Sequence, residues 1–219
     1  MHSDFNPDTF VQLFLKVGIY KKAFSLLQFQ PMETIKNNIS PRTQHFFHKL
    51  SDYLDTKLYY FGSVQRADYF PQASDIDVDV FTDNENSTMI KMQHFLKVKK
   101  TDFKRFVWKL NTNNRVVYGH KIMYKDPEGE FTAEFSIYNE KVKDWILKEH
   151  RMKTFLPFYA TWVLMILKFL FYTLGVIPAS WYIYIKKFTL STLIGLKYDE
   201  FTVIDLNKPK MVKNQKEQA

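Results

Sequence analysis

The sequence contains no cysteine in its 219 residues. This absence excludes disulfide scaffolds, thiolate zinc sites and cysteine nucleophiles together, and it is compatible with a reducing compartment. The first ten residues, MHSDFNPDTF, also lack a basic region followed by an apolar run. We therefore expect no secretory signal peptide and a cytoplasmic location.

Two further absences narrow the class of protein. The sequence has no glycine-rich loop ending in Lys-Ser or Lys-Thr, the loop with which many kinases and ATPases hold phosphate. It also has no internal repeat and no long low-complexity linker. What remains is an ordinary composition, 46% hydrophobic and 25% charged. The chain is long enough for one catalytic domain with a helical appendage.

The charge of the chain is basic, because 31 Lys and Arg outnumber 23 Asp and Glu and give a net charge of +8. Such a charge favours polyanions, either nucleic acid or an anionic membrane surface. The sequence is also rich in Asn, Ile, Phe and Tyr, as an AT-rich coding genome would produce without selection for any partner. The net charge alone therefore identifies no partner.

Helix start signals occur twice in the first part of the chain. Asn6-Pro7 and Ser40-Pro41 each place a capping residue before a proline at the first helical position. Apolar residues at helical spacing follow both signals, so we predict helices over residues 8–28 and 41–56. We expect both helices to serve as packing elements.

Strand signals dominate the middle of the chain, where β-branched and aromatic residues gather in short runs. The pattern predicts a surface helix at 85–99 and strands at 57–61, 76–80, 103–109, 116–124 and 130–137. A hairpin turn signal, Asp126-Pro127-Glu128-Gly129, joins the last two strands. After Glu140 the apolar period becomes helical again.

Two carboxylates stand out in the segment YFGSVQRADYFPQASDIDVDVF, which runs from residue 60 to 81. Residues two apart in a strand share a face, so Asp75 and Asp77 project together while Ile76 points into the core. Adjacent carboxylates repel one another unless a cation neutralises them. Hard oxygen ligands of this kind select Mg²⁺ or Mn²⁺, so we predict that both residues hold a divalent metal.

A third carboxylate is needed for a site with two metal ions about 3.5–4 Å apart. Glu134 is the candidate, because it is the only acid in the run FTAEFSIY and lies on a predicted strand. That strand can lie beside the one that carries Asp75 and Asp77. Glu130 is the alternative, since it shares the same alternating face four residues earlier.

A phosphate-binding turn is predicted at Gly62 and Ser63, which eleven residues separate from the aspartate pair. Glycine allows the backbone to approach a phosphate closely, and the serine hydroxyl and nearby amides can donate hydrogen bonds to it. Arg66, one turn later, has the forked guanidinium that suits phosphate oxygens, although an ordinary solvated arginine fits the sequence equally well.

Other acidic and basic residues in the sequence carry weaker signals. Asp79 continues the alternation, either as a group that supports the aspartate pair or as an exposed residue. A calcium-binding EF-hand is excluded, because the alternating apolar residues require a strand and no glycine follows at the turn position. His94 and His120 stand alone, and a lone histidine is more often structural or exposed than a ligand.

The combination of Gly62, Ser63, Asp75, Asp77 and a later Glu134 resembles the signature of DNA polymerase β-like nucleotidyltransferases. The resemblance is carried by residues 60–81 and extends more weakly to residue 138. Pro71 is also similar to a feature of the LicD-type phosphocholine transferases, whose fuller glycine- and tryptophan-containing pattern is missing. The sequence as a whole resembles nucleotidyltransferase-like proteins of large DNA viruses.

The resemblance implies an α+β fold, in which a small mixed or antiparallel sheet is flanked by helices, with further helical elements at both ends of the chain. The chain then divides into N-terminal helical elements at 1–56, a nucleotidyltransferase core at 57–150, an apolar helical appendage at 151–206 and a disordered tail at 207–219.

The resemblance also implies an activity. A nucleoside monophosphate would pass from a nucleoside triphosphate such as ATP to an acceptor hydroxyl, and pyrophosphate would leave. Asp77 and Glu134 would hold the metal that activates the acceptor, and Asp75 and Asp77 the metal bound to the triphosphate. The acceptor is a nucleic acid end, a protein or a small molecule. The alternative is a catalytically silent fold that acts as a nucleic-acid-bound or membrane-bound adaptor.

An apolar run at residues 155–177 contains one charged residue, Lys168, near its centre. Its length is sufficient to span a bilayer, and the lysine costs about 2.5–3.5 kcal/mol on an insertion scale. Membrane association through residues 155–185 is one interpretation. The other is a helical pair packed on the catalytic sheet, with a break near Gly175 and a restart after Pro178.

Overall fold

The structure is a computed structural model that describes residues 32–154, 156–193 and 200–204. The chain forms two units, residues 1–32 and 33–219, and the features below all belong to the second. The helix predicted at 8–28 and the disordered tail predicted at 207–219 lie outside the described residues.

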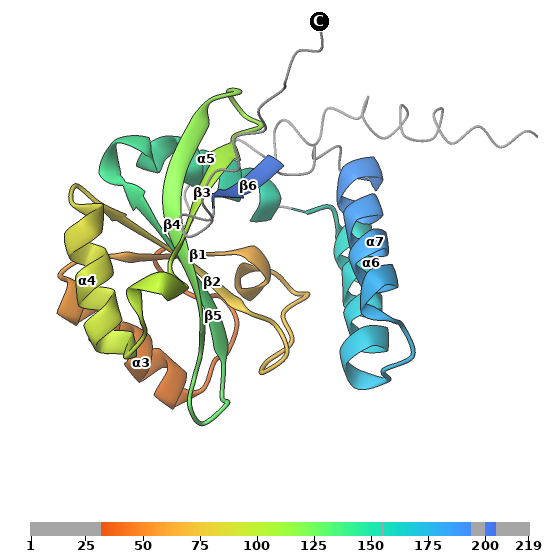
Figure 1. Ribbon diagram of the computed structural model, residues 1–219. Helices are drawn as coiled ribbons and strands as arrows, with labels where there is room; N and C mark the ends of the chain where they lie inside the picture. Colours follow the sequence, from red (N-terminus) through yellow and green to blue (C-terminus); the bar gives the residue numbers. More distant parts are fainter. Residues whose placement is uncertain (1–31, 155, 194–199, 205–219) are drawn as a thin grey trace, which may run out of the picture. The chain divides into compact units, whose positions relative to one another are not determined.

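A mixed six-stranded sheet in the order β1-β2-β5-β4-β3-β6 forms the centre of the fold (Figure 1). The strands are β1 (Leu58–Phe61), β2 (Ile76–Thr82), β3 (Lys104–Lys109), β4 (Val116–Lys125), β5 (Thr132–Asn139) and β6 (Glu200–Ile204). Strands β2 and β5 are parallel, and all other neighbours are antiparallel. The predicted α+β class with a mixed sheet is confirmed.

The alternation predicted for β2 is present in the structure. Ile76, Val78 and Val80 are fully buried in the main hydrophobic core, and the residues between them point to the other face of the sheet because strand side chains alternate. Helices α3 (Pro41–Leu54) and α4 (Glu85–Leu96) cover the core face. Burial of one face therefore fixes the register that directs the aspartates to the other.

Helix α3 begins where the sequence predicts. Ser40 is the N-cap, and its hydroxyl accepts a hydrogen bond from the Thr43 backbone N–H at 3.1 Å, which satisfies one of the free amides of the first turn. The helix ends at Leu54, and the C-cap residue Asp55 adopts the left-handed conformation with φ of 53°. Phe47 and Leu50 on its inner face are buried in the core beneath the sheet.

Three helices follow the sheet: α5 (Lys143–Thr154), α6 (Phe158–Lys168) and α7 (Ala179–Phe188). Helix α6 continues as a π-helical turn (Phe169–Thr173), and α7 restarts directly after Pro178. Gly175 lies in the intervening turn with φ of +63°. The predicted break and restart of this helical pair are thus confirmed, and the pair stands beside the sheet in Figure 1.

The region predicted as helical at 151–206 differs from the structure in two respects. Helix α5 runs continuously across residue 150, so the transition from core to appendage does not coincide with the end of an element. Residues 200–204 form strand β6, which pairs with the edge of β3. A five-residue strand with one apolar run is too short to be separated from a helix by periodicity alone.

Within the described residues, no single helix combines the length and the hydropathy needed to cross a bilayer. The pair Glu140–Thr154 and Phe158–Thr173 meets both requirements only when taken together, and its two parts are bent by 80°.

Candidate functional site

The three predicted carboxylates meet at neighbouring strands of the sheet. Asp75 immediately precedes β2, and Asp77 is its second residue. Because β2 and β5 are parallel, Glu134 is the direct Cα partner of Asp77. The predicted placement of Glu134 on a strand beside the aspartates is confirmed. Glu130, the alternative, hydrogen-bonds with Ser40 instead, where the serine hydroxyl donates at 2.7 Å.

Gly62 lies directly against the carboxylate of Asp77. Phe61, at the end of β1, pairs with Asp77, and the chain then turns sharply at Gly62 with φ of +70°. A Cβ atom added at Gly62 would fall on the Asp77 carboxylate oxygen. Both the backbone conformation and the close approach therefore require glycine at this position.

Ser63 belongs to a short 3₁₀ turn, η1 (Gly62–Gln65), that follows β1. Two side chains, one of them from outside the turn, fix its shape. Asn37 donates hydrogen bonds to the carbonyls of Val64 and Arg66, both at 2.8 Å. Gln65 donates to the Thr34 carbonyl at 2.6 Å. These bonds hold the glycine-serine turn in place beside the carboxylates.

All six residues predicted for the site line a single cavity of about 380 Å³: Gly62, Ser63, Arg66, Asp75, Asp77 and Glu134. The remaining walls come from β1, the loop before β2, β3, α5, and α6 and α7 with the π-helical turns that follow them. These segments contribute Phe61, Ser74, Trp108, His150, Lys153, Lys168, Tyr172, Tyr182, Lys186, Lys187, Leu190 and Ser191. The cavity therefore has an acidic side, formed by the sheet, and a basic side, formed largely by helices.

Burial and neighbouring carboxylates raise the pKa of both aspartates on the acidic side. Burial, followed by the charges of Glu134 and Asp75, raises the pKa of Asp77 to about 7. Burial and the charge of Glu134 also raise the pKa of Asp75. Each shift means that negative charge at this point is costly without a counter-ion. A donor set of carboxylate oxygens under mutual repulsion fits a hard divalent cation.

Glu134 has a partner that the sequence did not predict. Lys121, on β4, donates hydrogen bonds to both carboxylate oxygens of Glu134, at 3.2 and 3.1 Å. The described residues contain no group of three His, Asp or Glu side chains drawn together as ligands. The structure thus brings Asp75 and Asp77 together as a pair, with Glu134 beside them and held by Lys121.

The basic side of the cavity is built around one buried carboxylate that two cations share. Arg66 donates to both oxygens of Asp68, at 2.7 and 3.1 Å. Lys168, from α6, donates to the Asp68 carbonyl at 2.7 Å and to Ser74 Oγ at 3.1 Å. Its Nζ also lies 3.3 Å from the Asp68 carboxylate. This cluster carries one more positive than negative charge.

The pKa shifts in this cluster follow from that imbalance. Burial alone would raise the pKa of Asp68, but the hydrogen bond and charge of Arg66, together with Lys168, outweigh it and lower the pKa. For Lys168 burial prevails and lowers the pKa to about 8, with Arg66 opposing the second positive charge. Excess positive charge held out of water attracts an anion.

Asp79 is not exposed, which corrects one of the two interpretations of this residue. Its side chain is fully buried, and His150 Nε2 on α5 lies 2.8 Å from Asp79 Oδ2. His150 also stacks on Phe61, with ring centroids 3.8 Å apart. The Asp79–His150 pair thus joins β2 to α5 beside the cavity, and burial raises the Asp79 pKa against the effect of the histidine.

His150, Lys121 and Lys168 are the site residues that sequence reasoning missed in these roles. In the sequence, Lys168 stands out only as the one charged residue in an apolar run. Such an isolated charge is typical of a lysine that is buried in the folded protein. Lys121 stands on the same strand face as Met123 and Gly119 in an alternating strand, and nothing local distinguishes it. His150 lies in a helix with several other polar residues, so no pattern sets it apart.

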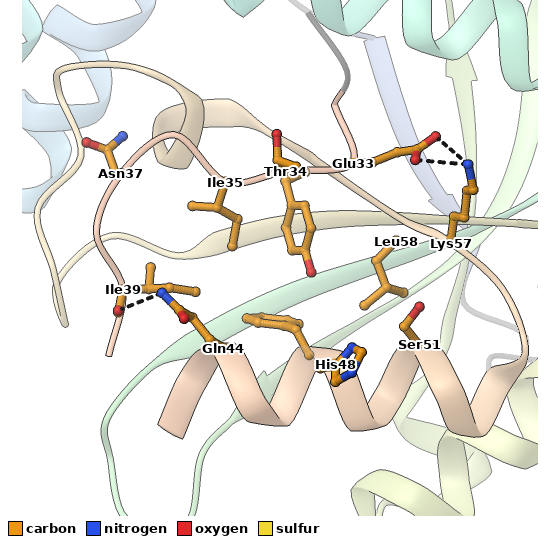
Figure 2. A pocket seen from close by; sticks show the side chains of 12 residues that line it. Glu33, Thr34, Ile35, Asn37, Ile39, Gln44, His48, Ser51, Lys57 and Leu58 are labelled. Carbon is orange, nitrogen blue, oxygen red and sulfur yellow. Dashed lines mark hydrogen bonds and ion pairs between the residues drawn. The ribbon is translucent and has the colours of Figure 1, made fainter. Parts of the chain in front are cut away.

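A second cavity lies away from the carboxylates. It measures about 440 Å³ and lies between α3, β1 and the segment that begins at Glu33 (Figure 2). Its walls combine apolar side chains, with Ile35, Ile39 and Leu58 among them, and polar ones, and a surface ion pair joins Lys57 to Glu33. None of the predicted site residues lines it, so we assign the chemistry to the acidic and basic cavity.

Comparison with known proteins agrees with this site. The family model of the nucleotidyltransferase domain matches residues 45–149, a range that includes all six predicted site residues. This part of the chain is therefore similar to a nucleotidyltransferase domain. Helices α6 and α7 lie beyond the matched range.

Two other comparisons concern curated proteins and solved structures. No curated protein matches the chain. A solved chain described as "structure of GLD-2/RNP-8 complex" is similar at 15% identity, over 72% of this chain and 64% of that one, with a TM-score of 0.27. The similarity therefore spans less than two thirds of that chain's length.

Proposed function

We propose that the protein is a metal-dependent nucleotidyltransferase that moves a nucleoside monophosphate from a nucleoside triphosphate to an acceptor hydroxyl. In this reaction the acceptor oxygen forms a bond to the α-phosphorus, the bond to the departing pyrophosphate breaks, and the hydroxyl proton is lost. The observation that carries the proposal is the convergence of Asp75, Asp77 and Glu134 with the Gly62-Ser63 turn in one cavity.

Asp75 and Asp77 are the residues that would hold Mg²⁺ or Mn²⁺, with Glu134 as a further ligand. When bound, the metal supplies charge neutralisation at the phosphates and activation of the acceptor oxygen. The raised pKa of Asp77 supports this assignment, because a cation would relieve the repulsion that raises it. Glu134 would join only by leaving Lys121, which makes Lys121 a competitor for this carboxylate.

The basic side of the cavity is suited to the polyphosphate. Ser63 and the backbone of its turn are placed to donate hydrogen bonds to phosphate oxygens beside the metal-holding carboxylates. Arg66 and Lys168 face the same space and share only one carboxylate. Lys186, on α7, adds a third cation to this wall. We propose that these cations orient the triphosphate so that its α-phosphorus lies near Asp77.

The test is transfer of labelled nucleotide. Purified full-length protein would be incubated with each α-labelled triphosphate, Mg²⁺ or Mn²⁺, and separate pools of RNA, DNA, protein and small metabolites. We expect label to be transferred to one pool. This transfer should require the metal and should be lost in Asp77→Asn. Absence of transfer to every pool, by a protein whose binding of triphosphate does not depend on metal, would contradict the proposal.

The second candidate is a catalytically silent fold that serves as an adaptor for nucleic acid or membrane. The ion pair between Lys121 and Glu134 favours this candidate. The lysine ammonium group neutralises the charge of the third carboxylate, which a metal would neutralise in an enzyme. Binding of labelled triphosphate with and without Mg²⁺ separates the two candidates. An enzyme should bind more tightly with the metal, whereas a silent fold should be indifferent to it.

A further inference from the structure

The hairpin formed by α6 and α7 has an uncharged end. From Phe169 to Ile185 the sequence contains no Asp, Glu, Lys, Arg or His, although this stretch includes a turn between two helices. Turns at a protein surface are usually polar. Here Leu174 and Val176 are exposed beside Gly175, and 65% of Val176 is accessible to solvent. This uncharged segment is called the hairpin tip below.

Large apolar side chains are also exposed along both helices of the hairpin. On α6 and its π-helical extension they recur at helical spacing, so they form one outward stripe: Phe158, Trp162, Ile166 and Phe169. On α7 they are Trp181, Ile183, Tyr184 and Phe188. An apolar surface of this extent on a soluble domain usually marks a site of interaction.

The opposite side of the hairpin is already occupied by the catalytic domain. Lys168 is buried against Asp68 and Ser74, and Tyr182 is buried and stacked on Phe171 at 4.5 Å. Lys186 lines the catalytic cavity. The hairpin thus presents an inner face to the site and an outer face to solvent, so packing on the sheet does not account for the exposed residues.

We propose that the outer face and tip of the α6–α7 hairpin dock on the surface of an anionic lipid bilayer, lying in the interface without crossing it. The proposal concerns a surface distinct from the transfer chemistry and does not depend on it. The uncharged arms between Lys168 and Leu174 and between Pro178 and Lys186 span about 9 to 12 Å at the helical rise per residue. That reach matches the shallow burial of interfacial helices, about 5–10 Å, and falls far short of the roughly 30 Å hydrocarbon core.

Three features favour a bilayer as the partner. Trp and Tyr, which combine an apolar ring with a polar group, are typical of the membrane interface, and Trp162, Trp181 and Tyr184 are all exposed here. The charged residues nearest to the tip in the sequence, Lys168 and Lys186, are both lysines. A net charge of +8 adds attraction to an anionic surface.

Vesicle cosedimentation tests the proposal on the full-length chain. Vesicles of phosphatidylcholine alone and of phosphatidylcholine with phosphatidylserine would be compared at physiological salt. We expect the protein to sediment with the anionic vesicles and less with the neutral ones. Tryptophan emission should shift to the blue on binding, and brominated lipid should quench it. Trp181→Phe should reduce that quenching.

Substitutions at the tip provide the matched comparison. Val176→Glu should lower the vesicle partition coefficient about tenfold, which corresponds to about 1.4 kcal/mol. Because Val176 is exposed, the variant should unfold at the wild-type temperature. Ile90→Glu, at a residue of α4 that is 52% exposed, is the control and should bind vesicles like the wild type.

Three outcomes would overturn the proposal. The first is the absence of sedimentation with vesicles of either composition, and the second is sedimentation that Val176→Glu leaves unchanged. The third is a concentration-dependent dimer in analytical ultracentrifugation that Val176→Glu dissolves while vesicle binding is absent, which would assign the surface to a second copy of the chain.

Discussion

Asp77 lies between the glycine turn and the strand that carries Glu134. Its carboxylate faces the Gly62 backbone on one side and the Glu134 strand position on the other, and its negative charge is costly enough to raise its pKa to about 7. A residue in that position contributes little to stability, since its charge is unfavourable in the folded chain. Its presence is better explained by binding than by packing.

We predict that Asp77→Asn lowers the rate of nucleotidyl transfer by about 10³-fold, the factor for about 4 kcal/mol of transition-state stabilisation. The unfolding temperature should remain equal to the wild-type value or rise, because the substitution removes a repelled charge. The control is Asp83→Asn, an exposed carboxylate just after β2. Wild-type turnover by a correctly folded Asp77→Asn protein would refute the catalytic role.

Gly62 and Gly129 form a matched pair for a second prediction. Both have positive φ, +70° and +76°, but an added Cβ meets the Asp77 carboxylate only at Gly62 and meets nothing within 4 Å at Gly129. Each alanine variant should lose about 1–2 kcal/mol of stability from backbone strain. Only Gly62→Ala should also weaken Mn²⁺ binding, measured by electron paramagnetic resonance. Equal Mn²⁺ affinity in the two variants would show that Gly62 serves the backbone alone.

At the scale of elements, α6 is fastened to the loop that precedes β2 by Lys168. The lysine bonds Asp68 and Ser74, and Ser74 is the residue directly before Asp75. A displacement of α6 would therefore move Ser74, and the peptide bond between Ser74 and Asp75 would pass that movement to the carboxylate pair. In the same way the Asp79–His150 contact fastens α5 to β2 from within the protein.

The Lys168 contact predicts a pH dependence of stability. Burial lowers the Lys168 pKa from its usual 10.5 to about 8. Between these values the unfolded chain holds a proton that the folded chain has released, so the unfolding free energy should rise with pH from about 8 to 10.5. Lys168→Met should lack this part of the rise. Urea unfolding at several pH values measures the difference between the two proteins.

An exposed lysine of α4 provides the control for this measurement. Lys91→Met should follow the wild-type pH profile, since Lys91 lies at the surface. If Lys168→Met and the wild type show parallel profiles across this window, the lysine is not held in its buried position in solution.

At the scale of the whole molecule, ligand binding should appear as added stability. A metal-triphosphate complex at a hundredfold excess over its Kd stabilises the folded state by about 2.7 kcal/mol. For a chain of this size the unfolding temperature should rise by about 5–10 °C. The measurement is thermal unfolding with a non-hydrolysable triphosphate and Mg²⁺. EDTA or Asp77→Asn should remove the rise, and a rise that survives both would place binding elsewhere.

Much of this molecule is predictable from local sequence, and the remainder depends on contacts between distant segments. Alternation placed β2, the Ser40-Pro41 signal placed α3, and the break at Gly175 was recognisable, because each depends on residues within a few positions of one another. The partners of Lys168 lie about a hundred residues earlier. No local period encodes such a pairing, and the same holds for Lys121 with Glu134.

The parallel pairing of β2 with β5 determines when the site can assemble during synthesis of the chain. Parallel neighbours require a crossover connection, and here α4, β3 and β4 are all synthesised between the two strands. A nascent chain that has emerged only as far as β4 carries Asp75 and Asp77 but no Glu134. Non-local pairing of this kind is slow to form. Asp75 and Asp77 therefore remain on an incomplete sheet, without Glu134, until β5 leaves the ribosome and pairs with β2.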